Sequence, residues 1–222
     1  MEVAALRYPK KSHRKTVVLP TESSLLAEFF GIMLGDGGIN NAWQATITLN
    51  SESDATYAKY IERLCKKIFG IVPVIRKRKT GRTLIVSLAS TTVVDFLVMK
   101  GLPRGNKLRH GLAIPRWILQ RQEFRIACVR GLVDTDGCLF VHNHIIAKKR
   151  YKNIGFCFTS FSPELIKQVA TIFVEFGIIP HIASQGRRIY LYKEEAVAHY
   201  IKIFGTSNDR IRSVYEKWRR GG

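Results

Sequence analysis

The stretch FFGIMLGDG at Phe29–Gly37 has a counterpart one hundred residues later, VRGLVDTDG at Val129–Gly137. Each follows a polar cluster and runs through apolar residues and a glycine to Asp-Gly, which is the pattern of a buried helix that ends at glycine. Side chains four positions apart lie above one another on a helix, so small residues at that spacing make a narrow face. Each stretch has such a pair: Ala27 and Gly31, and Ala127 and Gly131. The sequence therefore predicts two helices whose backbones pack closely.

Such packing would bring Asp36 and Asp136 side by side at the C-terminal ends of the two helices. That position disfavours carboxylates, because the helix dipole is negative there and the like charges repel each other. A divalent cation removes both objections, and oxygen ligands suit Mg²⁺. We therefore expect Asp36 and Asp136 to be catalytic metal ligands, each assisted by a neighbouring backbone carbonyl such as that of Gly35 or Thr135. Paired carboxylates that hold two or more Mg²⁺ ions, or Mn²⁺ in their place, are suited to phosphodiester hydrolysis.

The two motifs resemble those of the LAGLIDADG homing endonucleases, in the single-chain, prokaryotic or archaeal form that carries both copies. The resemblance covers nearly all of residues 22–216. It implies an α+β fold of two pseudo-symmetric αββαββα halves, in which helices pack on antiparallel, saddle-shaped sheets that face DNA. It also implies a monomer, because two different halves on one chain need no symmetric partner.

Charge and composition agree with a nucleic-acid partner. The 222 residues include 36 Lys and Arg against 17 Asp and Glu, a formal net charge of +19, and such a surface favours a polyanion. No apolar run approaches the roughly 18 residues of a membrane span, and the N-terminus lacks a signal-peptide core. The four cysteines form no CxxC pair and are typical of buried thiols in a reducing compartment. We expect a cytoplasmic protein.

The chain is predicted to contain an internal repeat, with one structural unit present twice. The expected parts are a basic arm at residues 1–20, a first half at 21–101, a linker at 102–121, a second half at 122–218 and a tail at 219–222. A charge run such as Lys10–Lys15 in the arm is most often a solvated segment, and phosphate binding is the competing explanation that the total charge supports. Phe176–Pro180 matches Phe69–Pro73 almost letter for letter, which supports the repeat.

Local patterns predict the elements of each half. Strict alternation in Gln44–Asn50 predicts a half-buried strand, and a helix from about Ser53 closes at Phe69-Gly70. A hairpin over Thr80-Gly81 and a short helix at 92–100 complete the first half. The second half is expected to have a longer hairpin at 139–159, a helix that Ser162 caps, two more strands and a helix that ends at Phe204.

Outward-facing polar residues of these strands are the candidate DNA contacts, because twisted β-ribbons fit the major groove. In the first half they are Gln44, Thr46, Thr48, Arg76, Arg78, Arg82, Thr83 and Ser87. In the second half they are His142, His144, Lys152, Asn153, Gln185, Arg187, Arg188 and Tyr190.

The family resemblance also implies a polar or basic residue at a strand end and a lysine before the last helix, which order water and offset charge. By register these are Asn50, with Ser160 in the second half, and Lys193. Leu49 is the alternative at the first position, and an exposed lysine at a helix start is the alternative reading of Lys193. The first half has no lysine at the position of Lys193, so the two half-sites are expected to differ.

The predicted function is a site-specific homing endonuclease that cleaves both strands of a long, non-palindromic DNA target by Mg²⁺-dependent hydrolysis. Two alternatives share the fold. One is a maturase that binds intron RNA and assists splicing, which needs the basic surface but not the metal site. The other is a DNA-binding protein that does not cleave, and the two aspartates count against it because adjacent carboxylates without a cation would repel phosphate.

Overall fold

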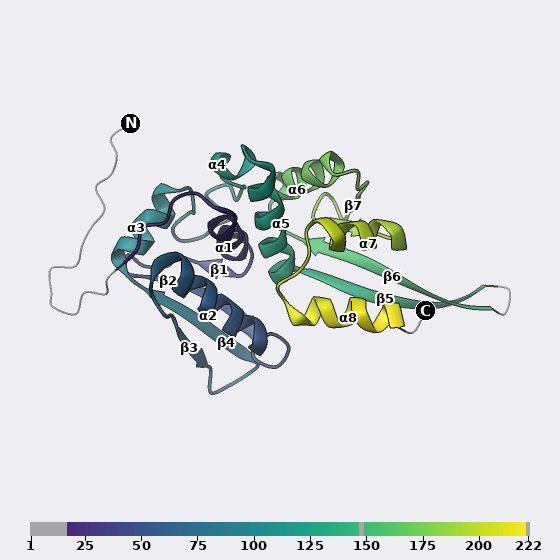
Figure 1. Ribbon diagram of the computed structural model, residues 1–222, viewed down its shortest axis with the longest axis horizontal. Helices are drawn as coiled ribbons and strands as arrows, with labels where there is room; N and C mark the ends of the chain where they lie inside the picture. The colour runs from purple at the N-terminus through teal and green to yellow at the C-terminus, as the bar shows by residue number, and fades with distance from the viewer. Residues whose placement is uncertain (1–16, 147–148, 221–222) are drawn as a thin grey trace.

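The computed structural model describes residues 17–146 and 149–220, which form two α+β halves with a four-stranded antiparallel sheet each (Figure 1). The basic cluster Lys10–Lys15 lies outside these residues. The first half contains α1 Ser24–Gly35, β1 Gly37–Gly38, β2 Gln44–Asn50, α2 Ala55–Phe69, β3 Val74–Lys77, β4 Thr83–Ala89 and α3 Thr91–Met99. The second contains α4 Arg116–Leu119, α5 Gln122–Asp136, β5 Gly137–Ile146, β6 Lys149–Thr159, α6 Pro163–Glu175, β7 His181–Ala183, β8 Arg188–Leu191, α7 Glu194–Ile203 and α8 Asp209–Arg220.

The predicted αββαββα order is confirmed in both halves. The strand orders β1-β2-β4-β3 and β5-β6-β8-β7 are equivalent. The alternation in Gln44–Asn50 does form a strand, with Ala45, Ile47 and Leu49 buried. Gly70 ends α2 in the left-handed conformation (φ 71°), and Ser162 caps α6 by accepting from the Leu165 N–H at 3.2 Å.

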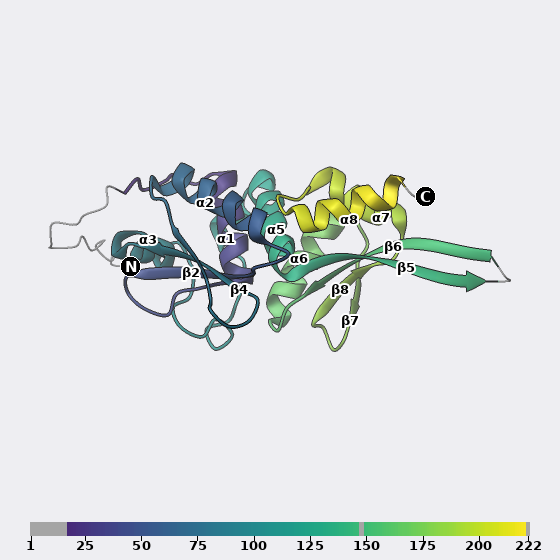
Figure 2. The same ribbon diagram turned by 90° about the horizontal axis from the view of Figure 1, so that it is seen from below.

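Helices α1 and α5 pack together at the centre of the molecule, between the two sheets (Figure 2). A Cβ atom on Gly31 would lie 2.1 Å from the Cys128 carbonyl oxygen, and one on Gly131 would lie 2.2 Å from that of Glu28. Real Cβ atoms do not come so close to backbone atoms, so only glycine fits at either position. The close approach predicted from the small residues is therefore confirmed.

Three features were not predicted. Helix α8 adds an element to the second half and buries Ile211 and Trp218 on a mostly polar helix. Strand β1 is only Gly37–Gly38, which pairs with Ile47 and Thr46. The expected linker is packed into the core through Leu112, Ile114 and Ile118, and α4 lies within it.

No helix among the described residues is long and apolar enough to cross a membrane.

Candidate active site and nucleic-acid interface

The ends of α1 and α5 bring Asp36 and Asp136 into one site. Asp36 is the C-cap of α1 and Asp136 is the last residue of α5. A Cβ atom on Gly35 would lie 3.2 Å from Asp136 Oδ2. The Asp136 carboxylate therefore reaches the end of α1. The charge of Asp36 also acts on Asp136. The structure thus joins the two aspartates that the repeated motif singled out.

Both carboxyl groups have raised pKa values. Burial raises the pKa of Asp36 to about 6, and the nearby Asp54 charge adds to this effect. Burial and the charge of Asp36 raise the pKa of Asp136 to about 7. Lys107 opposes both shifts without cancelling them. The site therefore carries negative charge that its own residues do not fully compensate, which is a donor set suited to a cation.

Replacing Asp136 with Asn is expected to raise the Tm of the metal-free protein at pH 8 and to leave it unchanged near pH 4. The folded protein holds the Asp136 proton more tightly than the unfolded chain, whose pKa is 3.8, so the free energy of unfolding falls as pH rises from about 4 to about 7. Asn removes this cost. Allowing for the partial exposure of the side chain, we expect the free energy of unfolding at pH 8 to rise by about 1 kcal/mol and Tm by about 2–4 °C. Calorimetry in EDTA measures both.

The exposed Asp209 supplies the control, because its carboxylate is paired with Arg212 on the surface of α8. An Asp209→Asn variant should show no such gain at pH 8. Equal Tm values for Asp136→Asn and wild type at pH 8 would contradict the burial of an uncompensated carboxylate.

Lys107 reaches the same site from the segment that follows α3. Its ammonium group donates to the carbonyl oxygens of Leu34 (2.8 Å), Met33 (3.4 Å) and Gly35. A cation at a helix C-terminus is favourable, because the last carbonyls lack partners within the helix. Burial lowers the pKa of Lys107, while Asp136 and Asp36 raise it. Lys107 is thus the lysine that acts on both carboxylates.

Lys193, the lysine expected in this role, lies elsewhere. It is the N-cap residue of α7, is exposed, and lines a pocket with His181 and Tyr192. It is not among the charges that shift the pKa of Asp36 or Asp136. Lys107 sits in a Gly-Asn-Lys loop after α3, where the sequence has no periodic pattern from which its position could be predicted.

Arg210 is the counterpart of Lys107 at the end of α5. It follows α7, as Lys107 follows α3, and it donates to the carbonyl oxygens of Gly137 (3.1 Å) and Asp134 (3.2 Å). Its Nε also donates to Asp54 Oδ1 at 3.1 Å. Each helix end is therefore capped by a cation from the same place in its half, but the cation is a lysine in one and a carboxylate-bound arginine in the other.

A buried polar cluster holds this arrangement together. Asp134 accepts from the Thr206 hydroxyl and from the Ser207 N–H (2.7 Å), and burial raises its pKa to about 7. Asn208 Nδ2 donates both to Asp54 Oδ1 (3.0 Å) and to the Asp134 carbonyl (2.9 Å). The cluster thereby connects the start of α2 in the first half to the end of α5 in the second.

The strand residues nearest the aspartates differ from those expected. The Asp36 carbonyl accepts from the Thr48 N–H at 3.1 Å, and the pairing of Gly137 with Phe158 places Thr159 next to Asp136 in the same way. Asn50 instead closes the turn before α2, where its Oδ1 accepts from Glu52 N (2.9 Å) and Ser53 N (3.2 Å). Ser160 is buried, and its hydroxyl accepts from Ser162 N at 3.2 Å.

The atoms that could bind a divalent metal at the helix ends are oxygens. The described residues contain no cluster of three or more His, Cys, Asp and Glu side chains that could hold an ion. Two partly buried carboxylates with raised pKa values, and carbonyls at the helix ends, still make an all-oxygen set of the kind that Mg²⁺, Mn²⁺ and Ca²⁺ accept. The Gly35 carbonyl accepts from Lys107, so the carboxylates are the principal ligands at the end of α1, and the Thr135 carbonyl stays a predicted ligand.

The open face of the first sheet carries most of the predicted DNA contacts. Its opposite face is buried through Ile47, Leu84 and Val86, so alternation turns the intervening residues outward. Pairing across β2, β4 and β3 brings together Gln44, Thr46, Thr48, Thr83, Ser87 and Arg76. Arg78 and Arg82 lie outside the strands at the hairpin turn, where Arg82 forms an exposed ion pair with Glu52 (3.2 Å).

The second sheet places its candidates less uniformly. His142, Asn153, Arg188 and Tyr190 alternate with core residues and lie on the open face. Lys152 has the same parity as the buried Ile154, on the helix-covered side, where its carbonyl accepts from Trp218 Nε1 at 3.5 Å. Gln185 and Arg187 lie in the turn between β7 and β8. The side chain of His144 is outside the described part of the chain.

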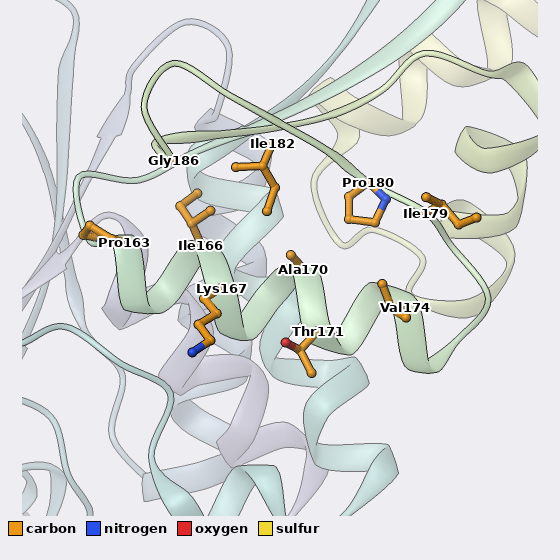
Figure 3. A pocket seen from close by; sticks show the side chains of 10 residues that line it. All are labelled: Pro163, Ile166, Lys167, Ala170, Thr171, Val174, Ile179, Pro180, Ile182 and Gly186. Carbon is orange, nitrogen blue, oxygen red and sulfur yellow. The ribbon is translucent and has the colours of Figure 1, made fainter.

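A separate apolar groove lies between α6 and residues 179–186 (Figure 3). Its lining includes the exposed Val174 and Ile179, with Lys167 at its edge. None of the predicted site residues lines it.

Comparison with known proteins finds a family model for the second half and the same fold in solved structures. Residues 123–218 match the model of the LAGLIDADG-like domain. A comparison with curated protein sequences gives no match. The meganuclease I-SmaMI, bound to uncleavable DNA, has 12% identity and a TM-score of 0.59, over 89% of this chain and 90% of that one.

Two further solved structures have the same fold. The homing endonuclease I-DmoI in complex with DNA and Mn has 15% identity and a TM-score of 0.53, over 83% of this chain and 97% of that one. The LAGLIDADG meganuclease I-AabMI bound to uncleaved DNA has 10% identity and a TM-score of 0.58, over 90% of this chain and 92% of that one. Residues 123–218 thus match the LAGLIDADG-like domain, and most of the chain has the same fold as these meganucleases.

Proposed function

We propose that this protein is a site-specific endonuclease that cuts both strands of a long, asymmetric DNA target in a reaction that depends on Mg²⁺. One observation carries the proposal: Asp36 and Asp136 meet, partly buried and incompletely neutralised, at the ends of α1 and α5, which lie between the two sheets. Solved structures of the same fold hold DNA, and some also hold Mn or Ca. Mg²⁺ has the same ligand preference.

The residues have separable tasks. Bound divalent ions would supply an activated water and neutralise charge on the phosphate. Asp36 and Asp136 hold the ions at the junction of the halves. Lys107 keeps a positive charge beside the carboxylates and orders the end of α1, which fixes the position of Asp36. The open faces supply the polar and basic contacts that bind the duplex and set its register.

The target should lack symmetry and be bound by one copy of the chain. The two open faces carry different residues, since the first has Gln, Thr and Arg where the second has His, Asn and Tyr. The helix ends also differ, with Lys107 at one and Arg210 at the other. One protein molecule therefore presents two unlike half-sites. Intron RNA is the alternative ligand, and the experiment must distinguish it from DNA.

The experiment is an incubation of the purified protein with a randomised duplex DNA library, in Mg²⁺ and in Ca²⁺, followed by sequencing of the ends. We expect discrete double-strand ends at one long motif, with Mg²⁺ only. Selective binding of a duplex motif without ends in either metal would contradict the nuclease proposal. Tighter binding of structured RNA than of any duplex in the library would instead support the maturase.

Replacing Lys107 with Met is expected to slow DNA cleavage by about 10–100-fold and to lower stability by about 1–2 kcal/mol. The stability loss follows because the C-terminal carbonyls of α1 lose a cation, and the slower rate follows because charge near the reacting phosphate is lost. Single-turnover cleavage and thermal unfolding measure the two effects.

Lys193→Met is the matched control, because Lys193 is exposed at the start of α7. We expect its cleavage rate to stay within about twofold of the wild type. If Lys193→Met cleaved DNA slowly and Lys107→Met cleaved it at the wild-type rate, Lys193 and not Lys107 would be the lysine that acts at the site.

A further inference from the structure

The open face of the second sheet carries a row of aromatic rings. The Phe140 ring centroid lies 4.6 Å from that of His142 on one side and 6.5 Å from that of Tyr190 on the other. Tyr190 stacks on Tyr192 at 5.3 Å, and Tyr192 lies 5.7 Å from His181. The row thus crosses the sheet from β5 to β7.

Gly155 allows the row to be continuous. It pairs with Phe140 across β5 and β6, and a Cβ on Gly155 would lie 2.4 Å from Phe140 Cε2. The Phe140 ring therefore lies over the bare backbone of β6 and reaches towards Tyr190 on the next strand. Any larger residue at position 155 would displace the ring, so Gly155 and Phe140 act as one unit.

Between its terminal histidines, the row presents mainly ring carbon. The Tyr190 hydroxyl accepts from Arg188 Nη1 at 3.3 Å, so the polar tip of the central tyrosine already has a partner. Tyr192 is 55% exposed, and Phe140 is half-buried. The equivalent face of the first sheet has no aromatic side chain on the described strands, and carries residues such as Thr46, Ser87 and Arg76 instead. The aromatic surface is therefore specific to one half, and the open face of the first sheet carries the aliphatic Val74 and Ile85 instead.

We propose that Phe140, Tyr190 and Tyr192 read the C5-methyl groups of thymines in the half-site that the second sheet contacts. The inference rests on the proposed DNA-binding function. In the major groove the thymine methyl is the apolar group that distinguishes base pairs, and aromatic side chains contact it. An exposed aromatic row on a protein with a net charge of +19 fits a duplex that offers phosphates at the groove edges and methyls in its floor.

The test replaces thymine with uracil, which removes only the methyl group. In the duplex selected above, deoxyuridine is placed in either half of the target, and Kd is measured with the wild-type protein in Ca²⁺. We expect Kd to rise about fourfold for each contacted methyl in one half, which corresponds to ~0.8 kcal/mol of lost burial. The same change in the other half should alter Kd by less than about twofold.

Variants then assign the sensitive half to the second sheet. Phe140→Ala should bind the thymine duplex more weakly and lose most of the difference between thymine and uracil in that half. Tyr192→Phe keeps the ring and should retain the difference. The Kd values of the wild-type protein for the thymine and uracil duplexes are also compared, and this comparison does not require any variant to fold.

The outcomes separate this inference from the proposed function. A selected target that is bound and cut but responds equally to uracil in both halves, or in neither, overturns the methyl contacts and leaves the nuclease standing. A sensitive half whose response survives Phe140→Ala overturns them too. Binding of single-stranded RNA that exceeds duplex binding and is lost in Phe140→Ala would mean that the rings stack on unpaired bases, which also overturns the proposal. Failure to select or cut any duplex is instead a failure of the nuclease function.

Discussion

Asp136→Asn is expected to bind the target DNA about as tightly as the wild type and to cleave it at least about 10²–10³-fold more slowly. Asn preserves the shape of the side chain but removes the charge that holds a divalent ion, and loss of one preorganised electrostatic group at a reacting centre typically costs that much. Asp36→Asn should behave in the same way. Binding survives because the open sheet faces, rather than the aspartates, make the DNA contacts.

Cleavage of supercoiled plasmid under single-turnover conditions separates the two strand breaks, because nicked and linear products are resolved. Asp209→Asn, with its exposed ion pair to Arg212, is the matched charge control and should cut at the wild-type rate. If Asp136→Asn still produced linear DNA at the wild-type rate, the shared metal site would be wrong.

Metal binding can be followed without cleavage. Ligands that bind only the folded state raise Tm, so Ca²⁺ should stabilise the wild type, whose two carboxylates are both intact. The Asp36→Asn and Asp136→Asn double variant should show no Ca²⁺-dependent rise. This readout is independent of whether the correct DNA target has been found.

The parts of the fold that local pattern encodes were predictable. Strict alternation located β2, helical spacing closed by Gly70 located α2, and Ser162-Pro163 located the start of α6. Helix α8 was missed although its sequence carries the signal: Ile211, Val214, Tyr215 and Trp218 stand at helical spacing, and all four pack against the core. The outward face of Lys152 was assigned wrongly, because the adjacent Asn153 was also assigned outward and neighbouring strand residues point to opposite faces.

The candidate site was predictable only where the repeat marked it. Asp36 and Asp136 stand at the same place in two copies of one motif, so each copy supports the other. Lys107 is positioned by tertiary contacts with the carbonyls of α1, and a loop sequence contains no such information. Asn50 and Ser160 were chosen by counting along the strand, but their side chains serve the turns before α2 and α6.

Gly131→Ala is expected to lower stability by at least about 3 kcal/mol, a fall in Tm of about 6–12 °C, and to impair cleavage in whatever protein still folds. The added methyl group would stand 2.2 Å from the Glu28 carbonyl oxygen, and the obstacle is helix backbone that no rotamer change can move aside. The helices must separate, and the carboxylates at their ends separate with them.

Gly38→Ala is the matched control, since its Cβ would have only Asn40 Nδ2 nearby at 3.8 Å. We expect its Tm to change by no more than about 2–3 °C. At temperatures where Gly131→Ala remains folded, cleavage should fall more than DNA binding, because displacement of a catalytic group by about 1 Å can cost 10²-fold in rate while each sheet keeps its own surface. A Gly131→Ala protein with wild-type Tm and wild-type cleavage would mean that α1 and α5 do not meet at this position. The repeated glycine would then have no role in joining the carboxylates.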